Sequence, residues 1–93
     1  MSWLLIRSSA FVRAARKHLR KHPEHAPGLF ELLTQLTEDP FHASLRTHKL
    51  SGPLSGSWAC SAGYDLRVIF RTVKRGGGCA ILLETLGTHD EVY

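Results

Sequence analysis

The chain has 93 residues, 43% of them hydrophobic and 22% charged, and this composition predicts one globular domain spanning residues 1–93. No apolar run approaches the roughly 20 residues that a membrane span needs, and the apolar stretch from Trp3 to Ile6 is too short for a signal peptide. We therefore expect a cytoplasmic protein without a membrane partner. The formal net charge of +4 favours a polyanion or an acidic protein as partner.

The first forty residues predict a strand followed by two helices. The segment from Trp3 to Arg7 is typical of a short strand, apolar on both faces and therefore covered. Ser8 or Ser9 can cap the first helix, a second begins near Pro27, and Pro40 stops it because the residue before proline avoids the helical region. The apolar faces of the two helices consist of Phe11, Ala14, Ala15, His18 and Leu19, and of Leu29, Phe30, Leu32, Leu33 and Leu36.

The remaining residues predict a loop over 41–56 and then three strands. The clearest alternation sets Tyr64, Leu66, Val68 and Phe70 against Asp65, Arg67, Ile69 and Arg71. Gly76-Gly77-Gly78 is expected to form the hairpin turn that precedes the last strand, residues 79–86. The whole is an α+β domain, β-α-α-β-β-β, with a helical hairpin packed on one face of a mainly antiparallel four-stranded sheet.

Polar residues near the predicted sheet are candidates for proton transfer. Asp65 and Arg67 are two positions apart, so they share the uncovered face of one strand, either as a catalytic pair or as a salt bridge that keeps the sheet soluble. His48 lies in the basic loop and His89 follows the last strand. Each suits proton transfer near neutral pH, and each is alternatively an ordinary surface histidine. Tyr93 lies beyond the last strand, where its ring can stack on a base or bind a phosphate.

Three further groups of residues have side chains that could bind a partner or a metal ion. The first is a set of basic side chains that form either a solvated surface or a set of phosphate contacts: Arg13, Arg16, Lys17, Arg20, Lys49 and Arg71. His18 and His22 are one helical turn apart and His25 follows closely, but no acidic or cysteine ligand is expected near them and the segment is strongly cationic, so we expect no metal site and no cofactor. Cys60 and Cys79 lack metal-type spacing and are expected to be small core side chains, with a disulfide as the alternative.

Four motifs carry a family resemblance that covers essentially the whole chain. They are His48-Lys49-Leu50-Ser51-Gly52, Ser57-Trp58, Tyr64-Asp65-Leu66-Arg67-Val68-Ile69-Phe70 and Gly87-Thr88-His89-Asp90-Glu91-Val92-Tyr93. Together with the order of elements, they resemble the RelE/ParE superfamily of bacterial type II toxins, in particular its RelE/StbE and YafQ-like branch.

The resemblance implies a toxin that enters the ribosomal A site and cleaves messenger RNA without a metal ion, and a cognate antitoxin that blocks it. It implies catalytic roles for His48, Asp65, Arg67, His89 and Tyr93. We expect His48, assisted by Asp65, to act as base and His89 as acid. The chain departs from the family in two ways. The histidine expected in the strand before Asp65 is replaced by Ser61 or a neighbouring residue, and the glutamate base of YoeB-like members has no clear match, so His48 would have to take its place.

Two other functions remain compatible with the same fold. ParE-like members are non-enzymatic inhibitors of DNA gyrase, and they generally lack the set formed by His48, Asp65 and His89. A degenerate module that only binds the ribosome or RNA would use the basic side chains equally well.

Overall fold

A five-stranded sheet lies at the centre of the molecule, with the strand order β1-β5-β4-β3-β2. The computed structural model describes residues 3–61 and 65–92. β1 runs parallel to β5, and every other neighbouring pair is antiparallel. The strands are β1 (Leu4–Arg7), β2 (His48–Lys49), β3 (Trp58–Ser61), β4 (Arg67–Arg75) and β5 (Gly78–Gly87).

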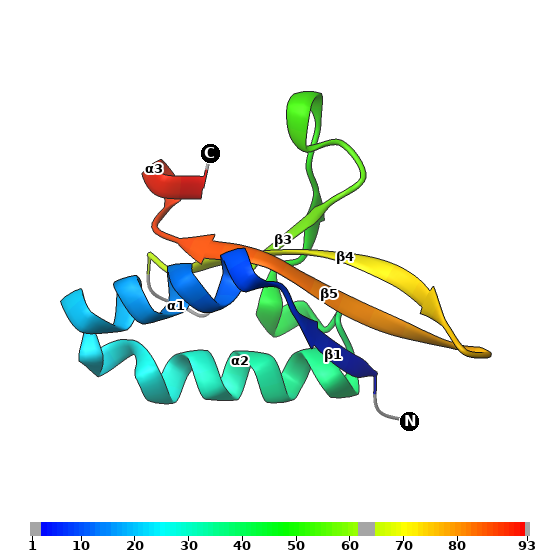
Figure 1. Cartoon of the computed structure of the whole chain (residues 1–93), viewed down its shortest axis with the longest axis horizontal. Helices are drawn as coiled ribbons and strands as arrows, with labels where there is room; N and C mark the ends of the chain where they lie inside the picture. The colour runs from blue at the N-terminus through cyan, green and yellow to red at the C-terminus, as the bar shows by residue number, and fades with distance from the viewer. Residues whose placement is uncertain (1–2, 62–64, 93) are drawn as a thin grey trace.

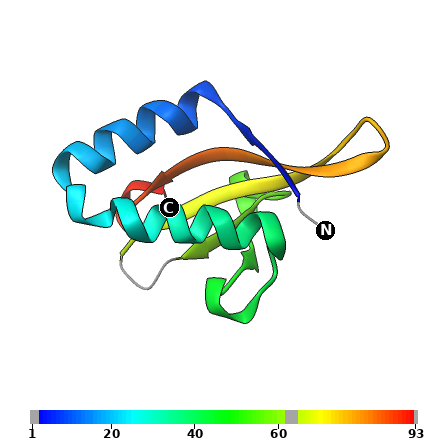
Figure 2. The same ribbon diagram turned by 90° about the horizontal axis from the view of Figure 1, so that it is seen from below.

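Two long helices cover one face of this sheet. They are α1 (Ser9–Lys21) and α2 (Ala26–Glu38), joined by the 3-10 helix η1 (Pro23–His25). Figures 1 and 2 show α2 running across the sheet and α1 along the side of β5. Three smaller helices complete the chain: η2 (Ala43–Leu45), η3 (Gly52–Leu54) and α3 (His89–Val92). In Figure 1, α3 and the segment around η3 project on the side of the sheet away from α2.

Local sequence signals account for the ends of these elements. Ser8 caps α1, since its Oγ accepts a hydrogen bond from the backbone N–H of Phe11 at 3.0 Å. Gly76 and Gly77 connect β4 to β5 with φ angles of 56° and 93°. A two-residue turn with both φ values positive matches the twist of the hairpin strands, and only glycine adopts it without steric cost.

The hydrophobic core lies between the helices and the sheet face that they cover. Phe11 of α1 and Leu36 of α2 meet Val68, Phe70 and Leu83 of the two central strands there. The side chains of Val68 and Phe70 are fully buried, as the alternation along this strand predicts. Because burial of apolar surface provides the main stabilisation, this layer fixes which face of β4 remains uncovered.

The structure confirms the α+β class and the helical hairpin on one sheet face, but the sheet has five strands and not four. The additional strand, β2, lies inside the predicted loop. It is only two residues long, below the length that alternation can reveal.

Three burial predictions are wrong. Phe30 is 73% exposed because the buried line of α2 runs through Leu29, Leu32 and Leu36. Leu4 is 57% exposed on β1, the edge strand. Cys79 is exposed beside the β4–β5 turn, which extends beyond the helices in Figure 1, whereas Cys60 is buried as expected.

Candidate active site

The strand register assigns His48 to the uncovered face of the sheet. His48 pairs with Ala59, and Ala59 pairs with Ile69. Directly paired residues in antiparallel strands project to the same side, so His48 lies on the same face as Ile69. Arg67 and Arg71 lie two positions before and after Ile69 and share that face. We call this face, which lies opposite the two long helices and bears His48, Arg67 and Arg71, the open face, although Ile69 on it is only 2% exposed.

The neighbour of His48 points the other way. Lys49 pairs with Trp58, and its Nζ lies 5.5 Å from the centre of the Trp58 ring, on the face that the helices cover. A cation at this distance over an aromatic ring is attracted by its π electrons. The side chains of His48 and Lys49 therefore lie on opposite faces of the sheet, and Lys49 does not belong to the open face.

The side chain of His48 makes a contact that bears on its protonation. His48 is exposed, and its Nδ1 lies 3.1 Å from the carbonyl oxygen of Arg46. A carbonyl only accepts hydrogen bonds, so Nδ1 carries the proton in this contact. The other nitrogen of a neutral ring, Nε2, is then a proton acceptor. In this tautomer the lone pair that a general base uses is on Nε2.

Asp65 does not form the expected strand pair with Arg67. β4 begins at Arg67, and Asp65 lies in the bend before it, where its Oδ1 accepts a hydrogen bond from the backbone N–H of His89 at 3.0 Å. His89 is the first residue of α3, so the carboxylate satisfies an N–H that has no partner inside the helix. The pattern-based placement was wrong because alternation cannot locate the end of a strand to within two residues.

A second contact closes the start of α3. The backbone N–H of Thr88 donates to Oε1 of Glu91 at 2.8 Å, as in a capping box. This hydrogen bond holds the pKa of the Glu91 carboxyl below its usual value, and the positive charge of Lys21 has a smaller effect in the same direction. Gly87, at the end of β5, is packed closely beneath the helix: a Cβ there would lie 3.0 Å from the Cβ of Glu91.

Arg71 belongs to a polar cluster on the open face that includes a residue the sequence argument missed, Glu84. The Ser57 hydroxyl donates to Oε1 of Glu84 at 2.6 Å, and Nε of Arg71 lies 3.5 Å from the same oxygen. Nη2 of Arg71 also donates to Ser57 at 3.4 Å. The charge of Arg71 is therefore partly balanced by Glu84. A single carboxylate within the apolar run 80–86 was the available sequence signal for this residue.

The candidate catalytic groups are spread along the open face and do not form a compact triad. Adjacent strands lie about 4.8 Å apart, so three strand steps separate the backbone of His48 from that of Gly87 by about 14 Å across the sheet. The register places Thr85 level with His48, so Gly87 also lies two residues, about 7 Å, further along β5. Arg67 pairs with Gly87 and lies between the two ends. A substrate long enough to reach both histidines, such as a nucleic-acid backbone, would pass over Arg67.

The remaining predicted site residues lie elsewhere. The basic residues Arg13, Arg16, Lys17 and Arg20 are all exposed on α1, which packs on the helix-covered side of the sheet. Tyr93 lies outside the residues that the structure describes.

A second group of titratable side chains lies at the end of α1. His18 is 4% exposed, and its Nε2 lies 2.8 Å from Nδ1 of His25. Burial lowers the pKa of His18, and the neighbouring His25 and His22 lower it further. His18 was expected on the apolar face of α1 and is found there.

Comparisons with known proteins were made for the family, the sequence and the fold. No family model matches the chain, and no curated protein matches its sequence. The fold matches YafQ from E. coli with a TM-score of 0.79 and 18% identity, over 98% of each chain. It matches the YoeB/ParE toxin from Agrobacterium tumefaciens with a TM-score of 0.74 and 15% identity, over 92% of this chain and 98% of that one. It also matches the toxin–antitoxin complex RelBE2 from Mycobacterium tuberculosis with a TM-score of 0.73 and 13% identity, over 96% and 100%.

These similarities show that the chain has the RelE-like fold. In the described ranges 3–61 and 65–92, no helix combines the length and the apolar character needed to cross a membrane.

Proposed function

We propose that this chain is the toxin of a type II toxin–antitoxin system and that it cleaves messenger RNA in the A site of translating ribosomes, in the cytoplasm and without a metal ion. The observation that carries the proposal is that His48 and Arg67 share the open face, while Asp65 holds the start of the His89 helix beside it. The RelE-like fold, which solved toxins share, supports the same conclusion.

The reaction begins with proton removal from a ribose 2′-hydroxyl. Nε2 of His48 takes this proton, and the 2′-oxygen attacks the adjacent phosphorus. The bond from phosphorus to the 5′-oxygen breaks, and the imidazolium of His89 protonates the departing oxygen. The products are a 2′,3′-cyclic phosphate and a 5′-hydroxyl end. Because no redox step or external group is needed, the residues of the chain and the substrate balance the reaction.

The guanidinium of Arg67 stabilises the negative charge that grows on the phosphate in the transition state. Asp65 has a positioning role in this scheme, since its contact is with the backbone of His89 and not with an imidazole ring. Tyr93 holds a base or the phosphate. Lys49, Arg71 and the basic face of α1 bind RNA or the acidic surface of the cognate antitoxin.

The test is cell-free translation with purified protein, in which the 5′ ends of the messenger are mapped by primer extension. A chelator that removes zinc but spares ribosomal magnesium is present during cleavage. We expect new ends inside codons only where ribosomes translate. We expect His89→Ala to lower the cleavage rate about 10²–10⁴-fold, because the variant lacks the general acid. His42→Ala is the matched control. His42 is also an exposed histidine, but its ring is hydrogen-bonded to Ser44 in η2 and has no role in the proposed reaction.

Two results would contradict the proposal. Intact messenger together with blocked DNA supercoiling would indicate a gyrase inhibitor. Intact messenger without any effect on supercoiling would indicate a binding module that has lost its catalysis.

A further inference from the structure

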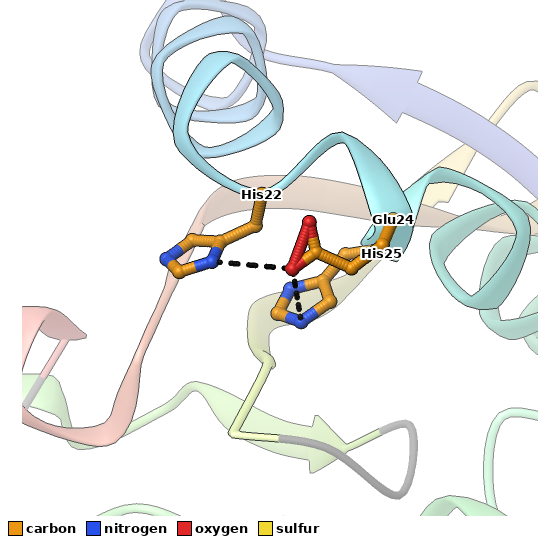
Figure 3. A group of neighbouring side chains, drawn as sticks. All are labelled: His22, Glu24 and His25. Atoms are coloured by element: carbon orange, nitrogen blue, oxygen red, sulfur yellow. Dashed lines mark ion pairs between the residues drawn. The ribbon is translucent and has the colours of Figure 1, made fainter.

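The turn between α1 and α2 brings three potential metal ligands together, at a place that the proposed reaction does not use. His22 follows the last residue of α1, and Glu24 and His25 belong to η1. Figure 3 shows the carboxylate of Glu24 between the two imidazole rings. We propose that His22, Glu24 and His25 bind a divalent transition-metal ion, Zn²⁺ above all, through two imidazole nitrogens and one carboxylate oxygen.

The ligand atoms lie somewhat further apart than they would around a bound ion. Oε2 of Glu24 lies 3.6 Å from Nδ1 of His22 and 3.9 Å from Nε2 of His25. One ligand atom from each of the three residues lies within 4.8 Å of the other two. Tetrahedral zinc with bonds of about 2.0–2.1 Å holds its ligand atoms about 3.3–3.4 Å apart. The two distances to Glu24 therefore have to contract by about 0.2–0.6 Å, and the ligand atoms of the two histidines, which lie within 4.8 Å of each other, have to approach by up to about 1.5 Å.

One ring has to turn for the site to close. The rings of His22 and His25 are nearly parallel, with an interplanar angle of 11° and centres 4.9 Å apart. The lone pair of an imidazole nitrogen lies in the plane of its ring, so two parallel rings cannot direct both lone pairs at one ion. The side chains of His22 and Glu24 are 41% and 64% exposed, which leaves them room to rotate. His25, at 14%, is the fixed ligand.

An independent feature supports the role of His25. Its Nδ1 lies 2.8 Å from Nε2 of His18, a residue that is only 4% exposed. A histidine that binds a metal almost always has its other ring nitrogen held by a hydrogen bond. When Nδ1 of His25 donates to His18, the lone pair of the neutral ring is on Nε2, the nitrogen 3.9 Å from Oε2 of Glu24. His18 is thus a positioning residue for the fixed ligand.

The ligand set indicates which ion binds. Two imidazoles and one carboxylate suit Zn²⁺, and also Cu²⁺ or Ni²⁺, whereas Mg²⁺ and Ca²⁺ prefer oxygen ligands alone. Water would complete the coordination. The ion would join the end of α1 to η1 and the start of α2, and so would stabilise the folded chain.

The experiment uses the full chain without an affinity tag. ZnCl₂ is titrated in by calorimetry, and thermal unfolding is followed with and without the ion. We expect one ion per chain and a higher melting temperature with Zn²⁺. Glu24→Gln and His22→Gln should each weaken binding at least tenfold. Glu24 is the more informative position, since its side chain is 64% exposed and Glu24→Gln keeps its size. His42→Gln is the matched control and should bind like the wild type.

Visible absorption spectroscopy with Co²⁺ in place of Zn²⁺ reports the coordination geometry. Co²⁺ in a tetrahedral site should give visible absorption bands that Glu24→Gln removes. Absence of saturable Zn²⁺ binding would overturn the proposal. Binding that survives Glu24→Gln and His22→Gln, or that is lost instead in His48→Gln, would also overturn it, because the ion would then lie elsewhere. None of these measurements includes ribosomes, so their outcome is independent of messenger cleavage.

Discussion

Replacement of Asp65 separates a positioning role from a role in proton transfer. Asp65→Asn keeps a carbonyl oxygen that can accept the hydrogen bond from the His89 N–H but removes the charge, whereas Asp65→Ala removes both. If Asp65 acts only by holding α3, we expect the Asn variant to cleave nearly as fast as the wild type. The Ala variant should be slower, because the start of α3 is then held less firmly.

The size of the effect follows from the contact. The bond is 3.0 Å long and Asp65 is exposed, so its contribution resembles that of a helix-capping side chain, about 1 kcal/mol. This free energy lowers the ratio of docked to undocked α3 about fivefold. A helix of four residues has no stability of its own, so this contact matters. Loss of a residue that transfers a proton would instead cost about 10²–10⁴ in rate.

The assay is ribosome-dependent cleavage under single-turnover conditions, with the NMR signal of the His89 amide as a report on α3. Asp90→Ala is the control, because it removes a carboxylate from the same helix and leaves Asp65 in place. A loss of 100-fold or more in Asp65→Asn, with the His89 signal unchanged, would refute the positioning role.

Three further predictions concern the C-terminal helix and the thiols. Gly87→Ala places a Cβ 3.0 Å from that of Glu91, so we expect α3 to shift and stability to fall by about 1–3 kcal/mol, measured by denaturant unfolding; an unchanged midpoint would contradict this. Burial raises the pKa of Cys60 to about 12, so a thiol reagent should label only Cys79 in the native protein and both residues in denaturant. The pKa of Glu91 is lowered by the Thr88 N–H, so its stabilisation of α3 should be full at neutral pH and disappear as the pH falls through that lowered pKa. NMR signals of α3 in wild type and in Glu91→Ala test this, and identical acid titrations would count against it.

The sequence was sufficient where the relevant physics is local. The alternation correctly predicted the burial of Val68 and Phe70, because residues two apart in a strand share a face. Gly76 and Gly77 predicted their turn because the positive φ angles of a tight hairpin favour glycine. Ser8 was one of two expected caps, and the structure assigns it the role.

The candidate active site depends on contacts between distant segments. Asp65 and His89 are 24 positions apart, and neither carries a local signal for the hydrogen bond between them. Similarly, His48 joins the face of Arg67 only because a two-residue strand pairs with β3. The approach of Glu84 to Ser57 across the sheet was equally hidden.

The turn at the end of α1 is another place where the folded structure brings together residues that the sequence did not connect. The sequence predicted no acidic ligand near the three histidines, and this prediction is wrong. The 3-10 geometry of η1 places Oε2 of Glu24 3.6 Å from Nδ1 of His22 and 3.9 Å from Nε2 of His25.

By itself, the sequence determined the class of fold, the buried side of the central strand and the types of residue available for chemistry, since periodicity and turn propensity act over a few residues. Only the tertiary structure decided which of those residues meet. The register of the sheet and the docking of α3 bring together groups whose separation along the chain carries no information about their distance in space.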